Sequence, residues 1–473
     1  MQQKSELPEG WGLVSLGELV TPSKEKIEPS ENPTLKYIGL EHIESHKCQI
    51  NGYGVAGDIK STKTVFSRGD ILYGKLRPYL NKVCIPDFEG ICSTDILVFK
   101  ATPNLDNRYL MRFLSTPEVV DYANNNSSGV QLPRVNFQKL SNCTVPLPPL
   151  AEQHRIVSAI EALFARLDAT NEKLDRVPGI LKKFRQSVLA AACDGRLTEA
   201  WREENKQKLG CTDFLNILPI ENFDAYAPSD YDPIIPQSIP EEWKLSRCHN
   251  LCDNNRAVTY GVIKLGQPVE DGIPTLRSSD VRWLKIDKNH VKCISPEIAS
   301  NYSRTFLKGG EILVTVRGTL GGVAVVPQDM AGFNISREVA VIPLISGLNS
   351  HFFSYTIASK WSQNWLSEMT KGVAYTGINI KDLKNLPLPV PPLPEQHEIV
   401  KRVDALFAFT DSIEAKVAAA REKTEKLRQS ILAKVFSGEL VEIEAEIARR
   451  EGRDYETAKV LIEKIKAGKG KKE

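Results

Sequence analysis

The sequence predicts an α+β fold, in which two α/β bodies alternate with two long helices that pair as an antiparallel coiled coil. Three observations lead to this prediction. The end of one half of the chain recurs 243 residues later, two stretches carry apolar residues at a 3.5-residue spacing, and the remainder consists of short β-branched runs between turn residues. At 473 residues the chain is also too long for one ordinary domain.

The internal repeat sets the domain boundaries. Residues 128–197 align with residues 371–440 without a gap, and 28 of these 70 positions are identical. A weaker likeness joins LPEGW at 7–11 to IPEEW at 239–243, and 68–86 to 308–327. Each half therefore has a variable body followed by a repeated end, and the bodies are assigned to residues 1–150 and 239–393.

The two bodies are rich in short strand patterns. Apolar runs such as Ile96–Phe99, Ile312–Val316 and Val323–Val326 are bounded by Gly, Pro, Asn and Asp, which is typical of strands between tight turns. Helical patterns at Arg108–Leu114 and Phe352–Leu366 interrupt them. Each body is therefore expected to mix strands and helices.

Two spacer helices are predicted at 151–194 and 394–436. Each follows a Pro-rich stretch, which cannot be helical, and begins with a glutamate, Glu152 or Glu395, where the helix dipole favours an acid. We expect a kink or short break near Pro178. The predicted seams consist of Ile156, Ile160, Leu163, Leu167, Leu174 and Leu181 in the first helix, and Ile399, Val403, Leu406, Ile413, Val417, Leu427 and Ile431 in the second.

Each seam needs a partner, and the simplest partner is the other seam of the same chain. Residues 195–238 are then a connecting segment and residues 437–473 a C-terminal tail, with Gly195 and Gly438 as helix stops. Antiparallel pairing would place the two bodies at opposite ends of a stiff rod, in a pseudo-twofold arrangement. Such a rod suits a rigid, periodic ligand such as duplex DNA, although a protein-binding scaffold could use it equally well.

Composition narrows the class of protein. The net charge of +2 argues neither for nor against nucleic-acid binding, because binding depends on how the charge is distributed over the surface. Nine scattered cysteines favour reduced thiols over a disulfide framework. The polar N-terminus and the lack of a long apolar run make a cytoplasmic location without a membrane segment the expectation.

Motifs for catalysis or metal binding are weak. The G-x-G-x-x-G match at Gly52–Gly57 lacks a following helix pattern and a suitably placed acid, which favours a hairpin or loop. Cys248, His249 and Cys252 lack two further zinc ligands at matching spacing. The repeated His154 and His397 are expected at helix starts or an interface. We therefore expect no catalytic site, no metal and no cofactor on this chain.

Basic and polar residues in Gly-containing loops are the remaining signal. Arg suits guanine edges, Asn and Gln suit adenine, and Gly lets backbone amides approach phosphates. The DNA-binding candidates are Lys75, Arg77, Tyr79, Ser128, Gln131, Arg134 and Asn136 in the first body, and Arg317, Arg337, Tyr375, Thr376 and Asn379 in the second.

Over essentially its whole length, the chain resembles the DNA-specificity subunit of type I restriction–modification systems. The resemblance rests on PLPPLAEQHRIVSAIEALFARLD (146–168), PLPVPPLPEQHEIVKRVDALFAFTD (387–411), and the endings FRQSVLAAACDGRLTEAWR (184–202) and LRQSILAKVFSGEL (427–440). It implies that each body is a target-recognition domain for one half of a split DNA sequence, and that the paired helices set the gap.

The resemblance also implies the partners. Two methyltransferase subunits using S-adenosylmethionine would dock on the helical core, around 152–166 and 395–409, and two motor-nuclease subunits using ATP and Mg²⁺ could join them. The chain would then direct chemistry performed elsewhere. The tail after Leu440 departs from the pattern, because it lacks a match to LTEAWR at 197–202. Its Lys-rich end is expected to be solvated.

Overall fold

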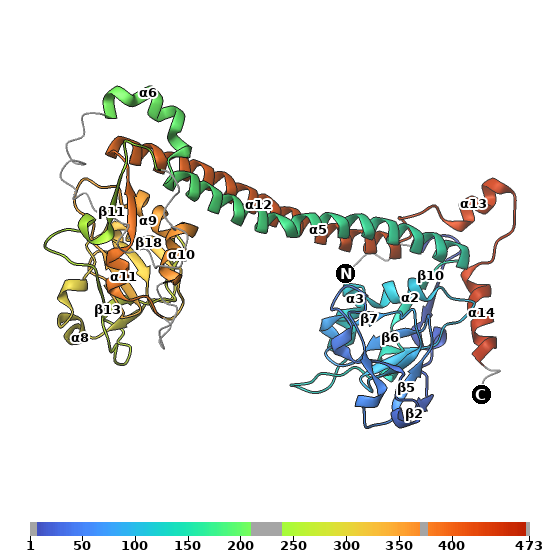
Figure 1. Ribbon diagram of the computed structural model, residues 1–473. Helices are drawn as coiled ribbons and strands as arrows, with labels where there is room; N and C mark the ends of the chain where they lie inside the picture. The colour runs from blue at the N-terminus through green and yellow to red at the C-terminus, as the bar shows by residue number, and fades with distance from the viewer. Residues whose placement is uncertain (1–6, 210–238, 369–376, 470–473) are drawn as a thin grey trace. The chain divides into compact units, whose positions relative to one another are not determined.

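The computed structural model describes residues 7–209, 239–368 and 377–469 (Figure 1). The chain divides into two compact units. Unit 1 combines Met1–Asp175 with Ala418–Glu473, and unit 2 consists of Arg176–Val417. Unit 1 is thus built from both ends of the chain, and each long helix contributes one half to each unit.

The body of unit 1 contains three small sheets. A two-stranded antiparallel sheet joins β1 (Gly12–Ser15) to β10 (Thr144–Leu147). A five-stranded sheet has the order β2 (Lys26–Ile27), β5 (Lys63–Phe66), β8 (Gly90–Cys92), β3 (Lys36–Ile38), β4 (Gly54–Val55). A three-stranded antiparallel sheet has the order β7 (Val83–Cys84), β6 (Ile71–Gly74), β9 (Ile96–Phe99).

Four short helices accompany these sheets, namely α1 (Leu16–Leu19), α2 (Asn107–Leu114), α3 (Pro117–Asn125) and α4 (Phe137–Leu140). Tyr109 of α2 and Phe99 of β9 are fully buried in the main core of the unit. The predicted helix at Arg108–Leu114 and strand at Ile96–Phe99 both form. The Gly52–Gly57 stretch forms β4 and the one-turn 3-10 helix Ala56–Asp58.

Unit 2 also contains a two-stranded antiparallel sheet and two larger sheets, together with a separate hairpin. Strand β11 (Lys244–Arg247) pairs with β21 (Pro387–Val390). The larger sheet has the order β12 (Thr259–Tyr260), β20 (Val339–Ile342), β17 (Ile312–Thr315), β18 (Val323–Val325). A second sheet has the order β16 (Lys292–Ile294), β13 (Ile273–Leu276), β19 (Asn334–Ile335), and β14 (Val281–Arg282) forms a hairpin with β15 (Lys285–Ile286).

The helices of the second body are α8 (Pro296–Ser300), α9 (Ser350–Ala358), α10 (Lys360–Glu368) and α11 (Ile380–Asn385). The helical stretch predicted at Phe352–Leu366 forms as two helices, because α9 ends before Ser359, whose ψ of 152° is extended. The Ser359 hydroxyl donates to the carbonyl of Thr356 at 2.7 Å and thus occupies a helix-terminal acceptor.

The two bodies share two strand arrangements, although most of their sequence shows little match and their remaining strands differ. In both, a parallel strand pair is present: β3 with β8 in unit 1, and β13 with β19 in unit 2. In both, a central strand (β6 or β17) lies between two antiparallel neighbours. The structure therefore extends the repeat beyond the segments that sequence alone could align.

The two long helices are α5 (Leu150–Cys193) and α12 (Leu393–Phe436), each of 44 residues. They begin one residue before the predicted boundaries. Gly195 and Gly438 follow their ends with φ of +80° and +79°, as left-handed helix stops do. Helix α5 continues without interruption through Pro178, so the expectation of a short break was wrong. Because a proline lacks only one amide donor, the helix can continue past it.

Ion pairs between α5 and α12 establish their antiparallel direction. In unit 1, Asp168 pairs with Arg428, and Asp175 pairs with Arg421 at 2.5 Å. In unit 2, Arg185 pairs with Asp411 at 2.6 Å. As the residue number rises along α5, that of its partner falls by the same amount. The two helices therefore run antiparallel with a constant register.

Most predicted seam residues lie inward, with one clear exception. The buried group is Ile156, Ile160, Leu167, Leu181, Ile399, Val403 and Ile431, and the half-buried group is Leu163, Leu174, Leu406, Ile413 and Val417. Leu427 is 47% exposed, so its assignment to the seam was wrong. A straight helix drifts about 20° per heptad from a strict 3.5 repeat, and here Arg428 takes the inward position.

The C-terminal tail is structured as α13 (Glu444–Glu451) and α14 (Ala458–Lys469). Leu461 and Ile465 of α14 are buried in the core of unit 1, and the Ala458 amide donates to the Gly10 carbonyl at 2.9 Å. Lys466 pairs with Glu18 at 2.7 Å while its side chain stays 53% exposed, and residues 470–473 of the Lys-rich end lie outside the described residues. Within the described ranges, the helices are all too short or too polar to cross a membrane.

Candidate functional site

In unit 1 the structure brings two predicted loops together. The Arg77 amide donates to the Pro133 carbonyl at 2.7 Å, and the Val135 amide donates to the Lys75 carbonyl at 3.0 Å. Ser128 and Arg134 exchange two backbone hydrogen bonds, both 2.9 Å. These bonds join the 75–79 turn and the 128–134 hairpin into one surface, which we call the unit 1 loop pair.

Most side chains of the unit 1 loop pair are exposed. Arg77, Tyr79, Ser128 and Gln131 all face solvent, and Lys75 is half-buried. Arg77 adopts a left-handed φ of 50°, a conformation that non-glycine residues rarely adopt. Arg134 is also exposed, but its guanidinium donates to the Asp95 carboxylate at 3.0 Å, and this hydrogen bond raises the pKa of Arg134.

In unit 2 the turn after β17 makes the matching backbone contact with Gly377 and Ile378, and we call these described residues the unit 2 loop pair. The Ile378 amide donates to the Val316 carbonyl at 2.8 Å. Arg317 and Gly377 form an antiparallel β-bridge, as Leu76 and Arg134 do in unit 1. The Arg317 and Arg337 side chains are exposed and make no ion pair with any residue in the described ranges. Tyr375 and Thr376 lie outside the described residues.

Two of the predicted DNA contacts have a structural role that the sequence reasoning did not assign. The Asn136 side chain accepts the Lys139 amide at 2.9 Å as the N-cap of α4, and the Asn379 side chain accepts the Lys381 amide at 3.0 Å as the N-cap of α11. An N-cap oxygen satisfies a helix-end amide that lacks another partner. These two asparagines are therefore explained as helix caps.

A buried carboxylate closes the start of each long helix. In unit 1, Glu152 accepts the Trp11 indole N–H and the Glu444 backbone amide, both at 2.8 Å. In unit 2, Glu395 accepts the Trp243 indole N–H at 2.8 Å, and the Thr198 hydroxyl and the Arg202 guanidinium at 2.7 Å each. Both carboxylates are fully buried, and burial raises the pKa of Glu152.

The glutamine that follows each carboxylate ties the helix start to the body. The Gln153 amide group donates to the Pro148 carbonyl at 2.9 Å and accepts the Asp106 amide at 3.0 Å. Gln396 does the same with the Pro391 carbonyl and the Asn349 amide, both at 2.9 Å. Asp106 and Asn349 are the N-caps of α2 and α9. Sequence reasoning missed this role, although the repeated Glu-Gln pair was its signal.

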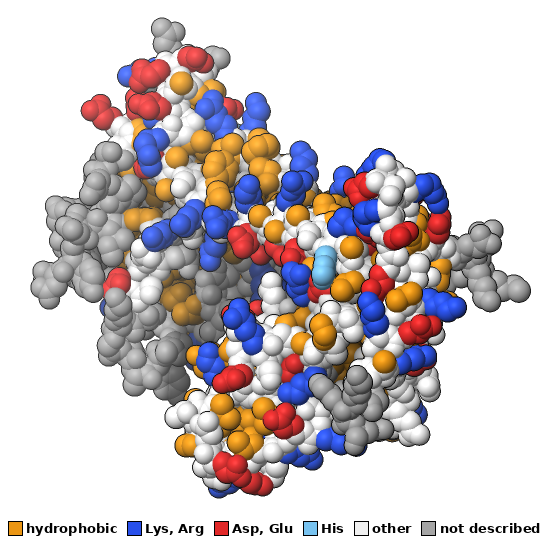
Figure 2. Space-filling model, turned by 90° about the vertical axis from the view of Figure 1, so that its right-hand side faces the viewer, with side chains coloured by type: hydrophobic (Ala, Val, Ile, Leu, Met, Phe, Trp, Pro, Cys, Tyr) orange, Lys and Arg blue, Asp and Glu red, His pale blue; other side chains and the backbone are white. Residues whose placement is uncertain are grey.

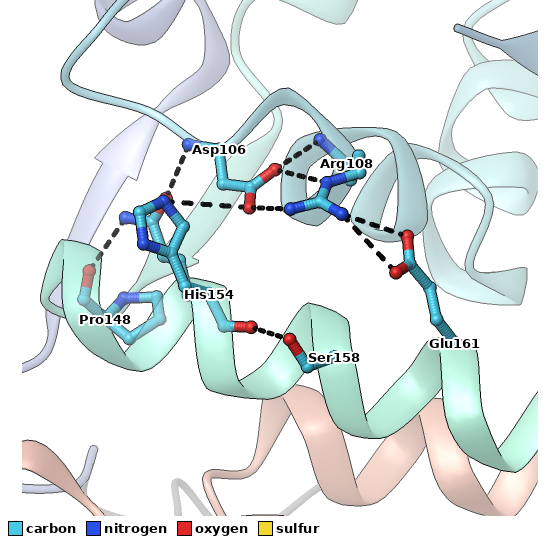
Figure 3. A network of polar contacts seen from close by, with 7 residues as sticks. Asp106, Arg108, Pro148, His154, Ser158 and Glu161 are labelled. Carbon is cyan, nitrogen blue, oxygen red and sulfur yellow. Dashed lines mark hydrogen bonds and ion pairs between the residues drawn. The ribbon is translucent and has the colours of Figure 1, made fainter.

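An exposed polar network adjoins this joint in unit 1 (Figure 3). His154 Nε2 lies 3.8 Å from Asp106 Oδ2, and Arg108 pairs with Asp106 at 3.1 Å and with Glu161 at 3.3 Å. Because His154 is 57% exposed, the network faces outward from the start of α5. The network therefore exposes basic and acidic side chains, such as Arg108 and Glu161, beside the start of α5.

The surroundings of one repeated phenylalanine differ between the units. In unit 1, the guanidiniums of Arg112 and Arg428 lie 5.0 and 4.3 Å from the Phe164 ring centroid. In unit 2, the equivalent Phe407 packs against Trp283 and Tyr355, with ring centroids 5.7 and 6.0 Å apart. The packing of helix against body is thus cationic in one unit and aromatic in the other.

The side of unit 1 that carries α13 and α14 has mixed charge. Figure 2 shows Lys and Arg side chains interspersed with Asp and Glu over this face. Arg449 pairs with Glu9 at 2.8 Å, and Lys466 pairs with Glu18. The charges compensate one another locally, so this face does not present a strong field of one sign.

Comparison with known proteins gives one family. Residues 8–178 and 271–420 match the family model for the type I restriction modification DNA specificity domain. Each of these two segments contains one loop pair and the start of one long helix. The second match begins after β11 and β12, the first strands of its body. The doubling of the match agrees with the internal repeat.

Relatives and solved structures agree with this family. The chain is 36% identical over 369 residues to the type I restriction enzyme EcoBI specificity subunit of Escherichia coli, covering 76% of this chain and 72% of that protein. It is 27% identical over 480 residues to the EcoDI specificity subunit of Escherichia coli, covering 98% and 96%.

Two solved structures share the fold. One, a chain from a study of complex assembly and conformational transition of the type I R-M system, matches with a TM-score of 0.67 at 22% identity, over 92% of this chain and all of that one. The HsdS subunit from Thermoanaerobacter tengcongensis matches with a TM-score of 0.56 at 23% identity, over 93% and 99%. Repeat, loop pairs, helices and relatives lead to one conclusion: the chain belongs to the family of type I restriction–modification DNA specificity subunits.

Proposed function

We propose that this chain is the non-catalytic DNA-reading subunit of a type I restriction–modification complex. Each body reads one half of a split duplex DNA site through its loop pair, and the paired helices α5 and α12 set the gap between the halves. The observation that carries this proposal is that the same backbone contact forms in both bodies, Val135 with Lys75 and Ile378 with Val316, although the side chains around it differ. Equal scaffolds with unequal side chains suit the reading of two different half-sites.

The side chains of the loop pairs have the chemistry for this task. Arg77 and Arg317 are exposed and belong to loops held by backbone hydrogen bonds, so their guanidiniums can reach base edges or phosphates. Arg134 must first release Asp95, which limits its contribution to affinity but can add selectivity. We therefore rank Arg317 and Arg77 above Arg134 as DNA contacts.

The proposed partners follow from the family. Two methyltransferase subunits, carrying S-adenosylmethionine, dock on the exposed faces of the helix starts, where the Asp106–Arg108–His154 network lies in unit 1. Two motor-nuclease subunits, using ATP and Mg²⁺, complete a restriction complex. In this proposal the chain holds no cofactor of its own and works in the cytoplasm.

The first test is a map of methylated adenines in cells that co-express this chain with its methyltransferase. The expected result is a split motif with a fixed gap. A continuous motif would mean that only one body reads sequence. Absence of new methylation despite a stable complex would instead favour the alternative function, a coiled-coil scaffold for proteins without DNA specificity.

Replacement of Arg317 by Ala tests the loop pair directly. Loss of a base contact should cost about 1–3 kcal/mol on the target duplex and relax one position of one half-site, whereas loss of a phosphate contact should weaken all sequences equally. Binding is measured by fluorescence anisotropy, with the paired Arg134→Ala variant for unit 1. Unchanged binding in both variants would refute the assignment of these residues.

The spacer role is tested by lengthening both helices together. One heptad inserted after Pro178 and one after Val417 preserve the antiparallel pairing and add about 10 Å of helix. The mapped gap should then change, or methylation should be lost. An unchanged motif with an unchanged gap would show that the helices do not set the spacing.

A further inference from the structure

A basic groove on unit 2 lies outside its loop pair. Two pockets of about 460 and 480 Å³ adjoin there, since both are lined by Arg256, Ala257, Val258 and Lys384. The first extends to Lys381 on α11, and the second extends to Arg304 and Lys308 beyond α8. Together they form one continuous depression, which we call the unit 2 groove.

The charge of the unit 2 groove is strongly positive. Arg256 is neutralised by Glu311, which it contacts at 2.6 Å. Arg304, Lys308, Lys381 and Lys384 have no ion pair within the described part of the chain. Asp253 is the single acidic residue that the described lining contains, and its carboxylate accepts the Asn255 amide at 2.9 Å. Four cations thus face one carboxylate, which favours a ligand with several negative charges.

The groove and the unit 2 loop pair are joined by one strand and one short helix. Strand β17 runs from the Glu311 end, beside the groove, to Arg317 in the loop pair, which is about 20 Å at 3.3 Å per residue. Helix α11 begins after the paired Gly377 and ends at Asn385 in the groove lining. About 20 Å corresponds to roughly six base pairs of duplex, at about 3.4 Å each.

The matching helix of unit 1 carries its charge at another position, because its one lysine, Lys139, aligns with Asp382 of α11. The repeat aligns Lys381 and Lys384 of α11 with Gln138 of α4 and with Ser141, which follows it. The Ser141 hydroxyl donates to the Gln138 carbonyl at 2.8 Å, so this position is occupied locally. The two lysines of α11 are therefore specific to unit 2, whereas Lys308 aligns with the exposed Arg68 of unit 1.

We propose that the unit 2 groove binds the phosphate backbone of duplex DNA that flanks the half-site read by unit 2. Lys381, Lys384, Arg304 and Lys308 neutralise consecutive phosphates and position the duplex without reading bases. This inference rests on the proposed DNA-reading function. It adds a phosphate-binding surface to unit 2 outside its loop pair.

The test is a salt titration of DNA binding by the full-length chain. Duplexes carrying the mapped site or a scrambled sequence are bound by wild type, by Lys381→Ala/Lys384→Ala and by Arg304→Ala/Lys308→Ala. Each lost phosphate contact should lower the slope of log K against log salt by about 0.9 and raise Kd about fivefold at 0.15 M salt. The rise should be equal for both duplexes.

The control is Lys285→Ala/Lys292→Ala, which removes two exposed lysines of unit 2 that do not line the groove, and which should retain the wild-type slope. Lys381→Arg/Lys384→Arg keeps the charge and should restore binding, which excludes a folding defect.

If wild type binds the mapped site while the groove variants keep its Kd and slope, the groove inference fails alone. A loss confined to the mapped site also overturns it, because that loss indicates base reading. If wild type itself shows no preference for any sequence, the proposed function fails.

Discussion

In unit 1 the buried Glu152 is satisfied by an indole and a backbone amide from the C-terminal tail, whereas in unit 2 Glu395 is satisfied by an indole, a hydroxyl and a guanidinium from the segment after α5. The tryptophan is the same in both, but the remaining donors differ in kind. A buried carboxylate needs hydrogen-bond donors, and different segments can supply them.

This difference explains how the tail can lack the LTEAWR pattern and still close its unit. Helix α13 follows α12 as the 3-10 helix Arg196–Thr198 and α6 (Glu199–Leu209) follow α5. The Glu444 amide donates to Glu152 as the Thr198 hydroxyl donates to Glu395. Arg155, from α5 itself, pairs with the Glu444 carboxylate at 2.6 Å. Both units therefore surround the buried glutamate with hydrogen-bond donors, although the residues that supply these donors are not the same.

The largest effect is expected from neutralising the two buried carboxylates. Glu395→Gln leaves Arg202, which is 6% exposed, with only its longer 4.0 Å ion pair to Glu242 and should cost unit 2 up to about 3–5 kcal/mol. Glu152→Gln disturbs only neutral donors and should cost unit 1 about 1–3 kcal/mol. Native-state hydrogen exchange, followed separately in α9 and α2, measures each loss. Equal losses would contradict the distinction between the two closures.

The next effect concerns α14, which has no described counterpart in unit 2. Leu461 is 1% exposed, so Leu461→Ala should cost unit 1 about 2–5 kcal/mol and leave unit 2 unchanged. Val460→Ala is the matched control, because Val460 on the same helix is 43% exposed and should cost under about 0.5 kcal/mol. An equal response of both units would show that the tail does not belong to unit 1.

The acid response should differ in sign between two carboxyl groups of unit 1. Burial raises the pKa of Glu444, but hydrogen bonds from Arg155 and Arg453 outweigh it, so its pKa is lowered overall. Its contribution to stability is present above the ordinary glutamate pKa and is lost as pH falls through the lowered value. Glu152, whose pKa is raised by burial, contributes in the opposite direction, with stability lost as pH rises through its raised value.

Urea unfolding of the full chain between pH 7 and pH 3.5 measures both contributions, with hydrogen exchange in α2 as the probe of unit 1. Glu444→Gln should flatten the loss of stability on the acid side, and Glu152→Gln should remove the opposing slope. If both variants follow the wild-type curve, the pH dependence arises elsewhere in the unit.

The smallest effect is expected at the repeated arginines of the coiled coil. Arg185→Ala removes partly exposed ion pairs with Asp411 and Glu414, worth about 0.2–1 kcal/mol and lost in high salt. Arg428→Ala also removes a guanidinium stacked on Phe164, so part of its cost of about 1 kcal/mol should persist at 0.5 M NaCl. Lys426→Ala, at an exposed pair with Glu422, is the control. Identical salt dependence for both arginines would argue against the stacking.

Sequence alone predicted the elements that depend on local pattern. The 3.5-residue spacing predicted α5 and α12 to within one residue, and β-branched runs predicted strands such as β9 and β17 closely. For the site, it predicted DNA contacts from residues in 75–79 and in 128–134. It did not predict that Arg77 and Pro133 would be hydrogen-bonded neighbours. Their 56-residue separation leaves no trace in a local pattern.

The sequence by itself determined the two-body organisation, the paired helices and the family, because duplication and heptad spacing are written in the order of residues. Tertiary structure alone decided that Leu427 is exposed while Arg428 packs on Phe164, and that the tail completes unit 1. Each of these outcomes depends on which groups remain unsatisfied or exposed after the chain has folded, and that competition is settled between residues far apart in sequence.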